Sequence, residues 1–212
     1  MPRDLVLAVA AVLSLLGEPV AALAVLVSFD CWLCISEVSG LTVDAVVDHR
    51  GQPDPVSRGV SVYLPVTKTG RHQAVRVEDA AVAELLAAWA EAVRRSGGRR
   101  LFGTPDALRR ALARALSAFY PAQFVARGLT FTWHSLRHGG ASRAHLAGCE
   151  MSWILIRGRW TVESSGRHYI QSGRQLLLSL GLPAAVSQLA ARVAASGLLV
   201  LFDPAVRLRL RP

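Results

Sequence analysis

The chain has 212 residues and a net charge of +9, from 24 basic and 15 acidic residues. A chain of this length can bury a sizeable apolar core, as one large domain or as a domain with a tail. Nearly every basic residue is an arginine, whose planar fork of donors matches phosphate groups. The charge therefore favours a polyanionic partner such as nucleic acid, and a merely solvated basic surface is the alternative.

The three cysteines form no recognisable framework. Their number is odd, and Cys31 and Cys34 make a C-x-x-C pair without the second pair that a structural zinc site needs. A reducing compartment is therefore expected, and secretion is not. The apolar run at 5–16 is shorter than the roughly 20 residues that cross a bilayer, so it predicts a buried helix instead of a membrane span or signal peptide.

Two apolar helices are expected at the amino-terminal end. The first covers residues 4–16, with Asp4 as its cap and Gly17 as its stop. The second begins at Pro19, a residue suited to a first helical turn, and runs to about Glu37. Both are apolar nearly all round, which is typical of core helices.

A loop and a β-hairpin are expected next. Residues 48–58 contain two prolines and a glycine, so they predict a loop. Apolar residues alternate with other residues at 60–65 and again at 74–77, with Thr69-Gly70 as the turn between them. This pattern predicts two antiparallel strands, with Lys68 at the turn.

The rest of the chain is predicted to be helical. Helices are expected at 79–95, 104–120, 133–146, 150–157 and 164–180, and a last apolar helix follows residues 181–183 and precedes a basic end at 207–211. The fold class is therefore mainly α with a small antiparallel β-sheet, that is, α+β. We divide the chain into a main domain at 1–180 and an apolar helix with a basic tail at 181–212.

Five residues stand out as candidates for chemistry. His134 and Arg137 lie three apart on one predicted helix face, Trp160 follows, Tyr169 comes nine residues later, and Lys68 sits in the hairpin. Each has an ordinary explanation by itself, as a surface, core or solvated residue. His134 and His138 have the i, i+4 spacing of metal ligands, but no third ligand lies near them in the sequence, so no metal is expected.

The combination resembles the tyrosine recombinase (phage integrase) family, over roughly residues 4–180. The shared pattern is H-x-x-R at 134–137, G-x-W at 158–160 and Tyr169, after a hairpin lysine. Leu33-Cys34-Ile35-Ser36-Glu37 also resembles the family's L-R-I-S-E segment. More weakly, residues 167–174 look like recombinases of eukaryotic mobile elements.

The resemblance implies a nucleophile and two groups that stabilise charge. Tyr169 would attack a DNA phosphate and form a 3′-phosphotyrosyl link that stores the bond energy, so that rejoining needs neither ATP nor metal. Arg137, and His134 as a hydrogen-bond donor, would stabilise the extra negative charge of the transition state.

The resemblance also assigns the remaining site residues. Lys68 is similar to the family's general acid, which protonates the departing 5′-oxygen. Trp160 occupies a position where many relatives have a second histidine, and its indole N–H can still donate to a phosphate oxygen. Arg159 and Arg167 are expected to bind the DNA substrate. No cofactor is expected.

The sequence departs from the family at Cys34, where the family has its first catalytic arginine. A neutral thiol is a weak donor and cannot clamp a phosphate through two bonds. Losing one such donor costs on the order of 10²–10³ in rate. A second departure is that the catalytic pattern begins almost at once, whereas relatives carry an amino-terminal DNA-clamping domain. The chain is accordingly a candidate fragment, a decayed copy, or half of a clamp completed elsewhere.

The expected function is DNA cleavage and rejoining for site-specific recombination or mobile-element integration. The alternative is an inactive, recombinase-derived domain that still binds DNA, and a type IB topoisomerase or a small helical membrane protein is a more distant one. The expected partners are double-stranded DNA and further copies of the chain in a synaptic tetramer, with no membrane. The stretch at 184–202 would dock on a neighbouring copy or cover its own core. The expected location is the nucleus in a eukaryote and the cytoplasm otherwise.

Overall fold

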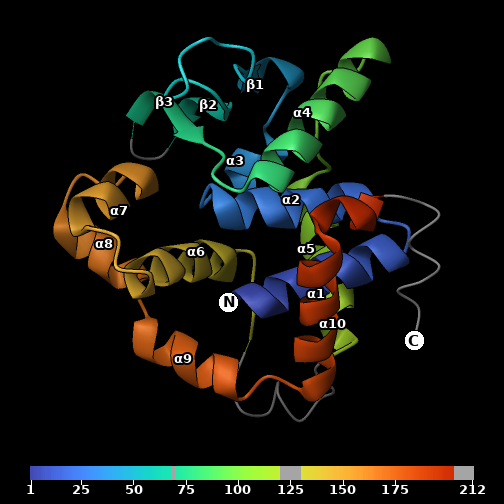
Figure 1. Cartoon of the computed structure of the whole chain (residues 1–212), viewed down its shortest axis with the longest axis vertical. Coiled ribbons are helices and arrows are strands. Elements are labelled where there is room, and N and C mark those ends of the chain that lie inside the picture. Colours follow the sequence, from blue (N-terminus) through green and yellow to red (C-terminus); the bar gives the residue numbers. More distant parts are fainter. Residues whose placement is uncertain (68–69, 120–129, 203–212) are drawn as a thin grey trace.

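The computed structural model describes residues 1–67, 70–119 and 130–202. The described chain is mainly helical, with one three-stranded antiparallel sheet in the order β1-β2-β3, so the α+β prediction is confirmed (Figure 1). The helices are α1 (Arg3–Leu15), α2 (Pro19–Asp30), α3 (Ile35–Ser39), α4 (Ala80–Arg95), α5 (Pro105–Ser117), α6 (His134–Leu146), α7 (Met151–Gly158), α8 (Glu163–Tyr169), α9 (Ser172–Leu180) and α10 (Ala184–Ser196), with short 3-10 turns at Val43–Ala45 and Leu198–Phe202. The strands are β1 (Val46–Asp48), β2 (Val60–Thr67) and β3 (Gly70–Arg76).

The two apolar helices form the centre of the main core, as expected. α1 and α2 pack on each other, α5 and α10 pack on α1, and α4 packs on α2. Most side chains of α1 and α2 are buried, which explains why neither helix has a polar face. Within the described part of the chain, no single helix has both the length and the apolar character of a membrane span. The bent pair Glu163–Leu180 and Ala184–Ser196 meets those criteria only when taken together, across a 106° bend.

The β-hairpin is confirmed, and it has a third strand that the sequence pattern did not reveal. β2 and β3 pair antiparallel, with Val62 opposite Val75. β1 is only three residues long and pairs with β2 through Val46 opposite Val62. A strand this short carries too little alternation to be recognised. Lys68, expected at the turn, lies outside the described residues.

The second predicted helix was too long. α2 ends at Asp30, and Trp32 has a left-handed backbone (φ 52°) from which the chain turns into α3. The N–H of Leu33 donates to the carbonyl of Ser28 (3.0 Å), which satisfies a carbonyl of the last turn of α2. Neither glycine nor proline marks this stop. The conformation is stabilised instead by the packing of Trp32, whose ring stacks on Trp160 (5.9 Å between centroids).

The helix predicted at 164–180 is also two helices. α8 ends at Tyr169, Ile170 and Gln171 leave the helical conformation, and α9 begins at Ser172. The hydroxyl of Ser142 on α6 accepts a hydrogen bond from the N–H of Gln171 (2.8 Å). A tertiary contact therefore supports the break directly after the candidate nucleophile.

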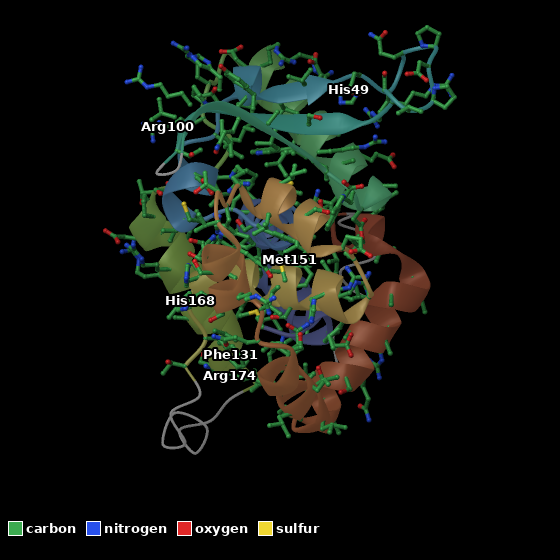
Figure 2. The ribbon with its side chains drawn as sticks, turned by 90° about the vertical axis from the view of Figure 1, so that its left-hand side faces the viewer. His49, Arg100, Phe131, Met151, His168 and Arg174 are labelled. Carbon is green, nitrogen blue, oxygen red and sulfur yellow. The ribbon has the colours of Figure 1, made fainter. Side chains whose placement is uncertain are left out.

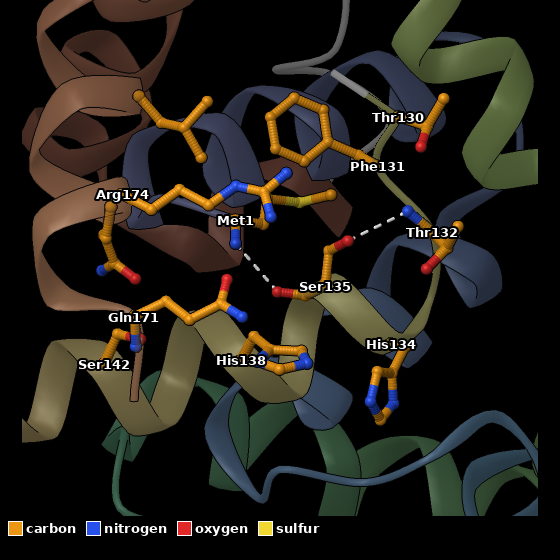
Figure 3. Close-up of a pocket in the computed structure, with 12 residues that line it drawn as sticks. Met1, Thr130, Phe131, Thr132, His134, Ser135, His138, Ser142, Gln171 and Arg174 are labelled. Carbon is orange, nitrogen blue, oxygen red and sulfur yellow. Dashed lines mark hydrogen bonds between the residues drawn. The ribbon is translucent and has the colours of Figure 1, made fainter. Parts of the chain in front are cut away.

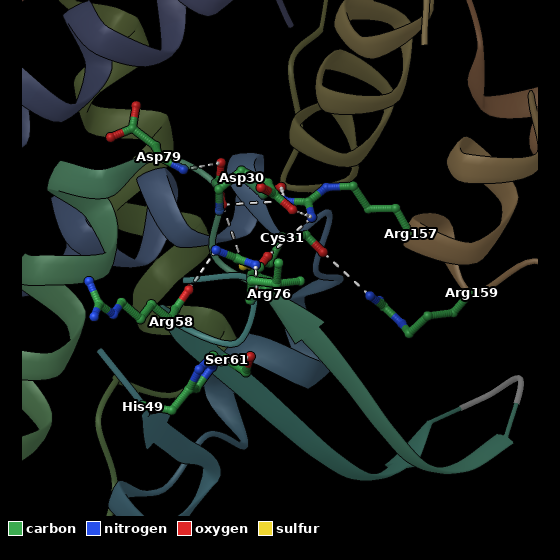
Figure 4. Close-up of polar contacts among 11 residues, drawn as sticks. Asp30, Cys31, His49, Arg58, Ser61, Arg76, Asp79, Arg157 and Arg159 are labelled. Atoms are coloured by element: carbon green, nitrogen blue, oxygen red, sulfur yellow. Dashed lines mark hydrogen bonds and ion pairs between the residues drawn. The ribbon is translucent and has the colours of Figure 1, made fainter. Parts of the chain in front are cut away.

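α6, α7 and α8 enclose a second, smaller core. Its buried members are Trp32, Ala141, Ile154 and Trp160. α7 is attached to the rest of the molecule by buried Arg157, which donates to the carbonyl of Asp30 (2.6 Å) and pairs with Glu78 (3.0 Å) (Figure 4). This attachment joins α7, which leads into Trp160, to the segments that contain Asp30 and Glu78.

We predict that Gly140→Ala destabilises the chain by about 1–3 kcal/mol, because it forces extra volume into a packed core. A Cβ at Gly140 would lie 2.3 Å from the ring of Trp32 and 2.6 Å from the carbonyl oxygen of Phe29. The measurement is the urea midpoint of unfolding. Gly173→Ala is the matched control, since nothing lies within 4 Å of a Cβ there and alanine favours the helix. Equal midpoints for Gly140→Ala and the unchanged chain would contradict the prediction.

α10 covers the chain's own core, which is one of the two alternatives for residues 184–202. Val186, Ala190 and Val193 are buried, and α10 packs on α1. The carboxyl-terminal apolar helix is thus continuous with the main core, and the basic end at 207–211 lies outside the described residues.

Candidate active site

Four of the predicted site residues converge on one surface. Tyr169, at the end of α8, stacks on Trp160 with 4.6 Å between the ring centroids. The ring of His134, in the first turn of α6, lies 5.2 Å from that of Tyr169. The guanidinium of Arg137 lies 5.1 Å from the Trp160 ring and 5.3 Å from the Tyr169 ring. Residues separated by up to 35 positions are therefore brought together by the packing of α6, α7 and α8.

Arg137 is held firmly within this cluster. It is 6% exposed, and its Nη2 donates to the carbonyl of Gly158 at the end of α7 (2.6 Å). A helix carboxyl terminus carries partial negative charge, so this carbonyl suits a cation. Burial, followed by the nearby charge of Arg159, lowers the pKa of Arg137, but an arginine stays protonated at neutral pH. The site therefore contains a fixed positive charge beside the tyrosine ring.

Glu37 is the site residue to which sequence reasoning gave no role. Its Oε2 accepts from the N–H of Cys34 (2.8 Å) and from Arg159 (2.9 Å), and it lies 3.5 Å from Nη1 of Arg137. The side chain is 9% exposed. Glu37 is three residues after Cys34, which is the spacing of a capping box. This spacing is the sequence pattern that could have identified Glu37.

Cys34 lies at the start of α3, and its N–H donates to Glu37, which also lies 3.5 Å from Arg137. It is partly exposed, and its Sγ lies 3.2 Å from the hydroxyl of Ser36. The degenerate position is thus part of the same cluster as Arg137. Through Glu37, the L-C-I-S-E segment contacts both Arg137 and Arg159.

The two arginines predicted to bind the substrate have different environments. Arg159 is 7% exposed and turned inward, where it donates to the carbonyl oxygen of Cys31 (3.3 Å, Figure 4) and to that of Trp32 (3.4 Å). A guanidinium placed this way is not available to DNA. Arg167 lies on the surface of α8 and pairs with Glu163 (2.5 Å).

The main chain of Tyr169 is held by two side chains from α6. Nδ1 of His138 donates to the Tyr169 carbonyl (3.2 Å), and the hydroxyl of Ser142 donates to the same oxygen (3.3 Å). His134, His138 and Ser142 follow one another at four-residue intervals, so they share a face of α6. This i, i+4, i+8 spacing could have revealed the last two from the sequence.

A pocket of about 280 Å³ opens beside His134 and His138 of α6 (Figure 3). Its lining includes Ser135, Ser142, Gln171 and Arg174, together with Met1, whose amino group donates to the Ser135 carbonyl (2.8 Å). His168 is exposed on the same side of the molecule, on the face that also carries Phe131 and Arg174 (Figure 2). The candidate site is therefore bordered by polar side chains from α6 and α9.

Burial keeps His134 and His138 neutral at physiological pH. It lowers the pKa of His138 to about 4, and it lowers the pKa of His134, which Arg137 and His168 depress further. A neutral imidazole at His134 can donate through one nitrogen and accept through the other. Among the described residues, no three His, Cys, Asp or Glu side chains are arranged to hold a metal ion.

We predict that acid destabilises the fold through His138. Its pKa is about 4 in the folded chain and about 6.5 when unfolded, so only the unfolded chain gains the proton between these values. Stability should fall as the pH is lowered from about 6.5 toward 4, by an amount on the order of 1 kcal/mol because the side chain is only partly buried. Urea midpoints across this range test it. His138→Gln should show a shallower pH dependence, and equal slopes would contradict the assignment.

Comparison of the chain with models of known protein families and with curated protein sequences gives no match.

Proposed function

We propose that the chain cleaves and rejoins DNA strands by transesterification, with Tyr169 as the nucleophile. The observation that supports this most is the convergence of Arg137, His134 and Trp160 on the ring of Tyr169. These are residues that the tyrosine recombinase pattern requires at a single site, and they come from three separate segments of the chain. In this proposal, cleavage and rejoining bring about site-specific recombination or mobile-element integration. The reaction takes place in the nucleus of a eukaryotic host or otherwise in the cytoplasm.

The proposed reaction exchanges one phosphoester for another. The phenolic oxygen of Tyr169 attacks the phosphorus, the bond from phosphorus to the 5′-oxygen breaks, and the departing oxygen takes up a proton. The product is a 3′-phosphotyrosyl link and a free 5′-hydroxyl, and the reverse reaction rejoins the strand. Arg137 would stabilise the extra negative charge on the non-bridging oxygens, with His134 as a further donor. Lys68 is proposed as the proton donor.

Assembly of several copies on DNA belongs to the same proposal. Since α10 covers its own core, we assign the contact between copies to α9, whose Leu176, Leu177 and Leu180 are exposed. Contiguous exposed apolar side chains of this kind mark interaction surfaces more often than chance.

A second candidate function is DNA binding without cleavage, and Cys34 is the observation that favours it. The thiol stands where the recombinase pattern has an arginine, and Glu37, which accepts from the N–H of Cys34, lies 3.5 Å from Nη1 of Arg137. Binding to DNA needs a basic surface only, whereas cleavage needs the complete set of donors. The two functions therefore predict the same affinity for duplex DNA and different covalent chemistry.

Both candidates predict salt-sensitive binding to duplex DNA. The net charge of +9 is carried almost entirely by arginine, and each neutralised phosphate releases a counterion. We expect micromolar affinity at about 50 mM salt and a loss of at least about tenfold at 200 mM. Fluorescence anisotropy of a labelled duplex measures it. Negligible binding at low salt, or affinity indifferent to salt, would exclude both candidates.

Cleavage itself is tested with a nicked duplex that traps the covalent product. The adduct is detected as a shifted band on a denaturing gel, and digestion followed by mass spectrometry locates the nucleotide. The proposal requires attachment at Tyr169. The absence of any adduct on DNA that is bound argues for the second candidate, whereas attachment at another residue would contradict Tyr169 as the nucleophile.

A further inference from the structure

Arg159 occupies an unusual position for a surface-loop arginine. It ends α7 in a left-handed backbone conformation (φ 59°), and its side chain is 3% exposed. Its side chain donates to the carbonyl of Cys31 (Figure 4). It also donates to the carbonyl of Trp32 and to the carboxylate of Glu37. The left-handed conformation is costly for a residue with a side chain, so the surrounding contacts must stabilise it.

Two buried arginines share one carboxylate at this point. Glu37 Oε2 lies 2.9 Å from Nη2 of Arg159 and 3.5 Å from Nη1 of Arg137. Two guanidinium groups and one carboxylate leave a net charge of +1. Within the described part of the chain, the Nε atoms of both arginines are buried without a hydrogen-bond partner. A cluster with an unneutralised charge and spare donors is suited to an anion.

We propose that Arg159 is a positioning residue that engages Glu37, so that the positive charge of Arg137 stays available for an oxyanion. The shorter contact of Glu37 is with Arg159, and the longer is with Arg137. Removing the Arg159 charge would leave Glu37 to neutralise Arg137, and the cluster would then have no net charge. Arg159 thereby keeps a net positive charge in the cluster, although Cys34 stands where the recombinase pattern has a charged arginine. The identity of the oxyanion as a DNA phosphate rests on the proposed function, but the charge balance does not.

The proposal makes a prediction that a purely structural role does not. If Arg159 only held α7 and α2 together, removing Glu37 as well would weaken the site further. If Arg159 acts through charge, removing Glu37 restores the net charge of +1 and rescues the site. Glu37→Gln alone raises the net charge to +2, so it should strengthen anion binding.

The test measures the affinity of the full chain for inorganic phosphate by isothermal titration calorimetry. We expect Arg159→Gln to weaken binding at least about fivefold, and the double variant Glu37→Gln/Arg159→Gln to return to within about twofold of the unchanged chain. Glu37→Gln should bind more tightly than the unchanged chain. Arg137→Gln should abolish binding, which locates the phosphate. Arg50→Gln is the matched control, because Arg50 also pairs with a carboxylate, Asp48 (2.6 Å), but on the exposed surface.

Three results would overturn the proposal: unchanged affinity in Arg159→Gln, a double variant weaker than Arg159→Gln, or no Arg137-dependent binding of phosphate. Circular dichroism and urea midpoints report whether each variant is folded. If Arg159→Gln does not fold, Glu37→Gln decides the question alone, since a structural role predicts weaker binding and the charge role predicts tighter binding. The nicked-duplex assay is run on the same variants. The predicted phosphate affinities without any adduct would support the charge balance and count against the proposed cleavage.

Discussion

Tyr169→Phe is expected to remove the covalent protein–DNA adduct to below detection, a loss of at least about 10³-fold, because the variant has no attacking oxygen. The phenyl ring that remains can still stack on Trp160 and lie against Arg137. Within the described residues, no hydrogen bond to the Tyr169 hydroxyl is recorded, so its removal leaves no buried partner unsatisfied. Folding and affinity for duplex DNA should therefore be unchanged.

The experiment compares Tyr169→Phe with Tyr63→Phe on the same nicked duplex. Tyr63 lies on β2 and its hydroxyl bonds to His72 of β3 (2.5 Å), so the control removes a phenolic oxygen outside the candidate site. Adduct should be lost from the first variant and kept by the second. Adduct that persists in Tyr169→Phe would show that another nucleophile acts, and would remove the basis of the proposed function.

Much of the fold followed from local patterns in the sequence. The apolar character of residues 4–16 and of the stretch from Pro19 to about Glu37 predicted the core helices, and alternation at 60–65 and 74–77 predicted the hairpin. These signals are local, because a helix or strand shows its buried face through its own periodicity. The three-residue strand β1 was too short to carry such a signal.

The errors were at breaks that depend on distant residues. Trp32 ends a helix without glycine, and the ring contacts that hold it come from Trp153 and Trp160, more than 100 positions away. The break after Tyr169 is held by Ser142 on another helix. Neither partner is visible to a reading of neighbouring residues, so both helices were predicted too long.

The sequence predicted several residues of the candidate site, but it did not predict the contacts between them. The spacing of His134, Arg137, Trp160 and Tyr169 identified a set that the structure brings together. The orientation of Arg159 was not predictable, because an arginine beside a tryptophan gives no indication of whether it faces solvent or a buried carboxylate. Glu37 was recognised as part of a motif, but its position between two arginines is a property of the fold.

Cys34→Arg is expected to raise the yield of covalent adduct at least about tenfold, which corresponds to about 1.4 kcal/mol of transition-state stabilisation. Cys34 is partly exposed at the start of α3, so a longer side chain has room toward solvent. Its main chain is already fixed by the bond from its N–H to Glu37 (2.8 Å). An arginine here adds a charged fork beside Arg137, where the recombinase pattern has one.

The comparison variants separate the charge from the shape of that fork. Cys34→Lys adds the charge as a single point, so it should give a smaller gain than Cys34→Arg, because only the guanidinium can donate two parallel bonds to one phosphate. Cys34→Gln adds length without charge and should give no gain. Tyr169→Phe in the Cys34→Arg background should remove the adduct, which ties the gain to the nucleophile.

Equal adduct from the unchanged chain and from Cys34→Arg would mean that the cluster of Arg137, Arg159 and Glu37 already supplies the required charge. No adduct from Cys34→Arg, on DNA that the variant binds as tightly as the unchanged chain, would mean that the site does not cleave, and DNA binding without catalysis would then be the function.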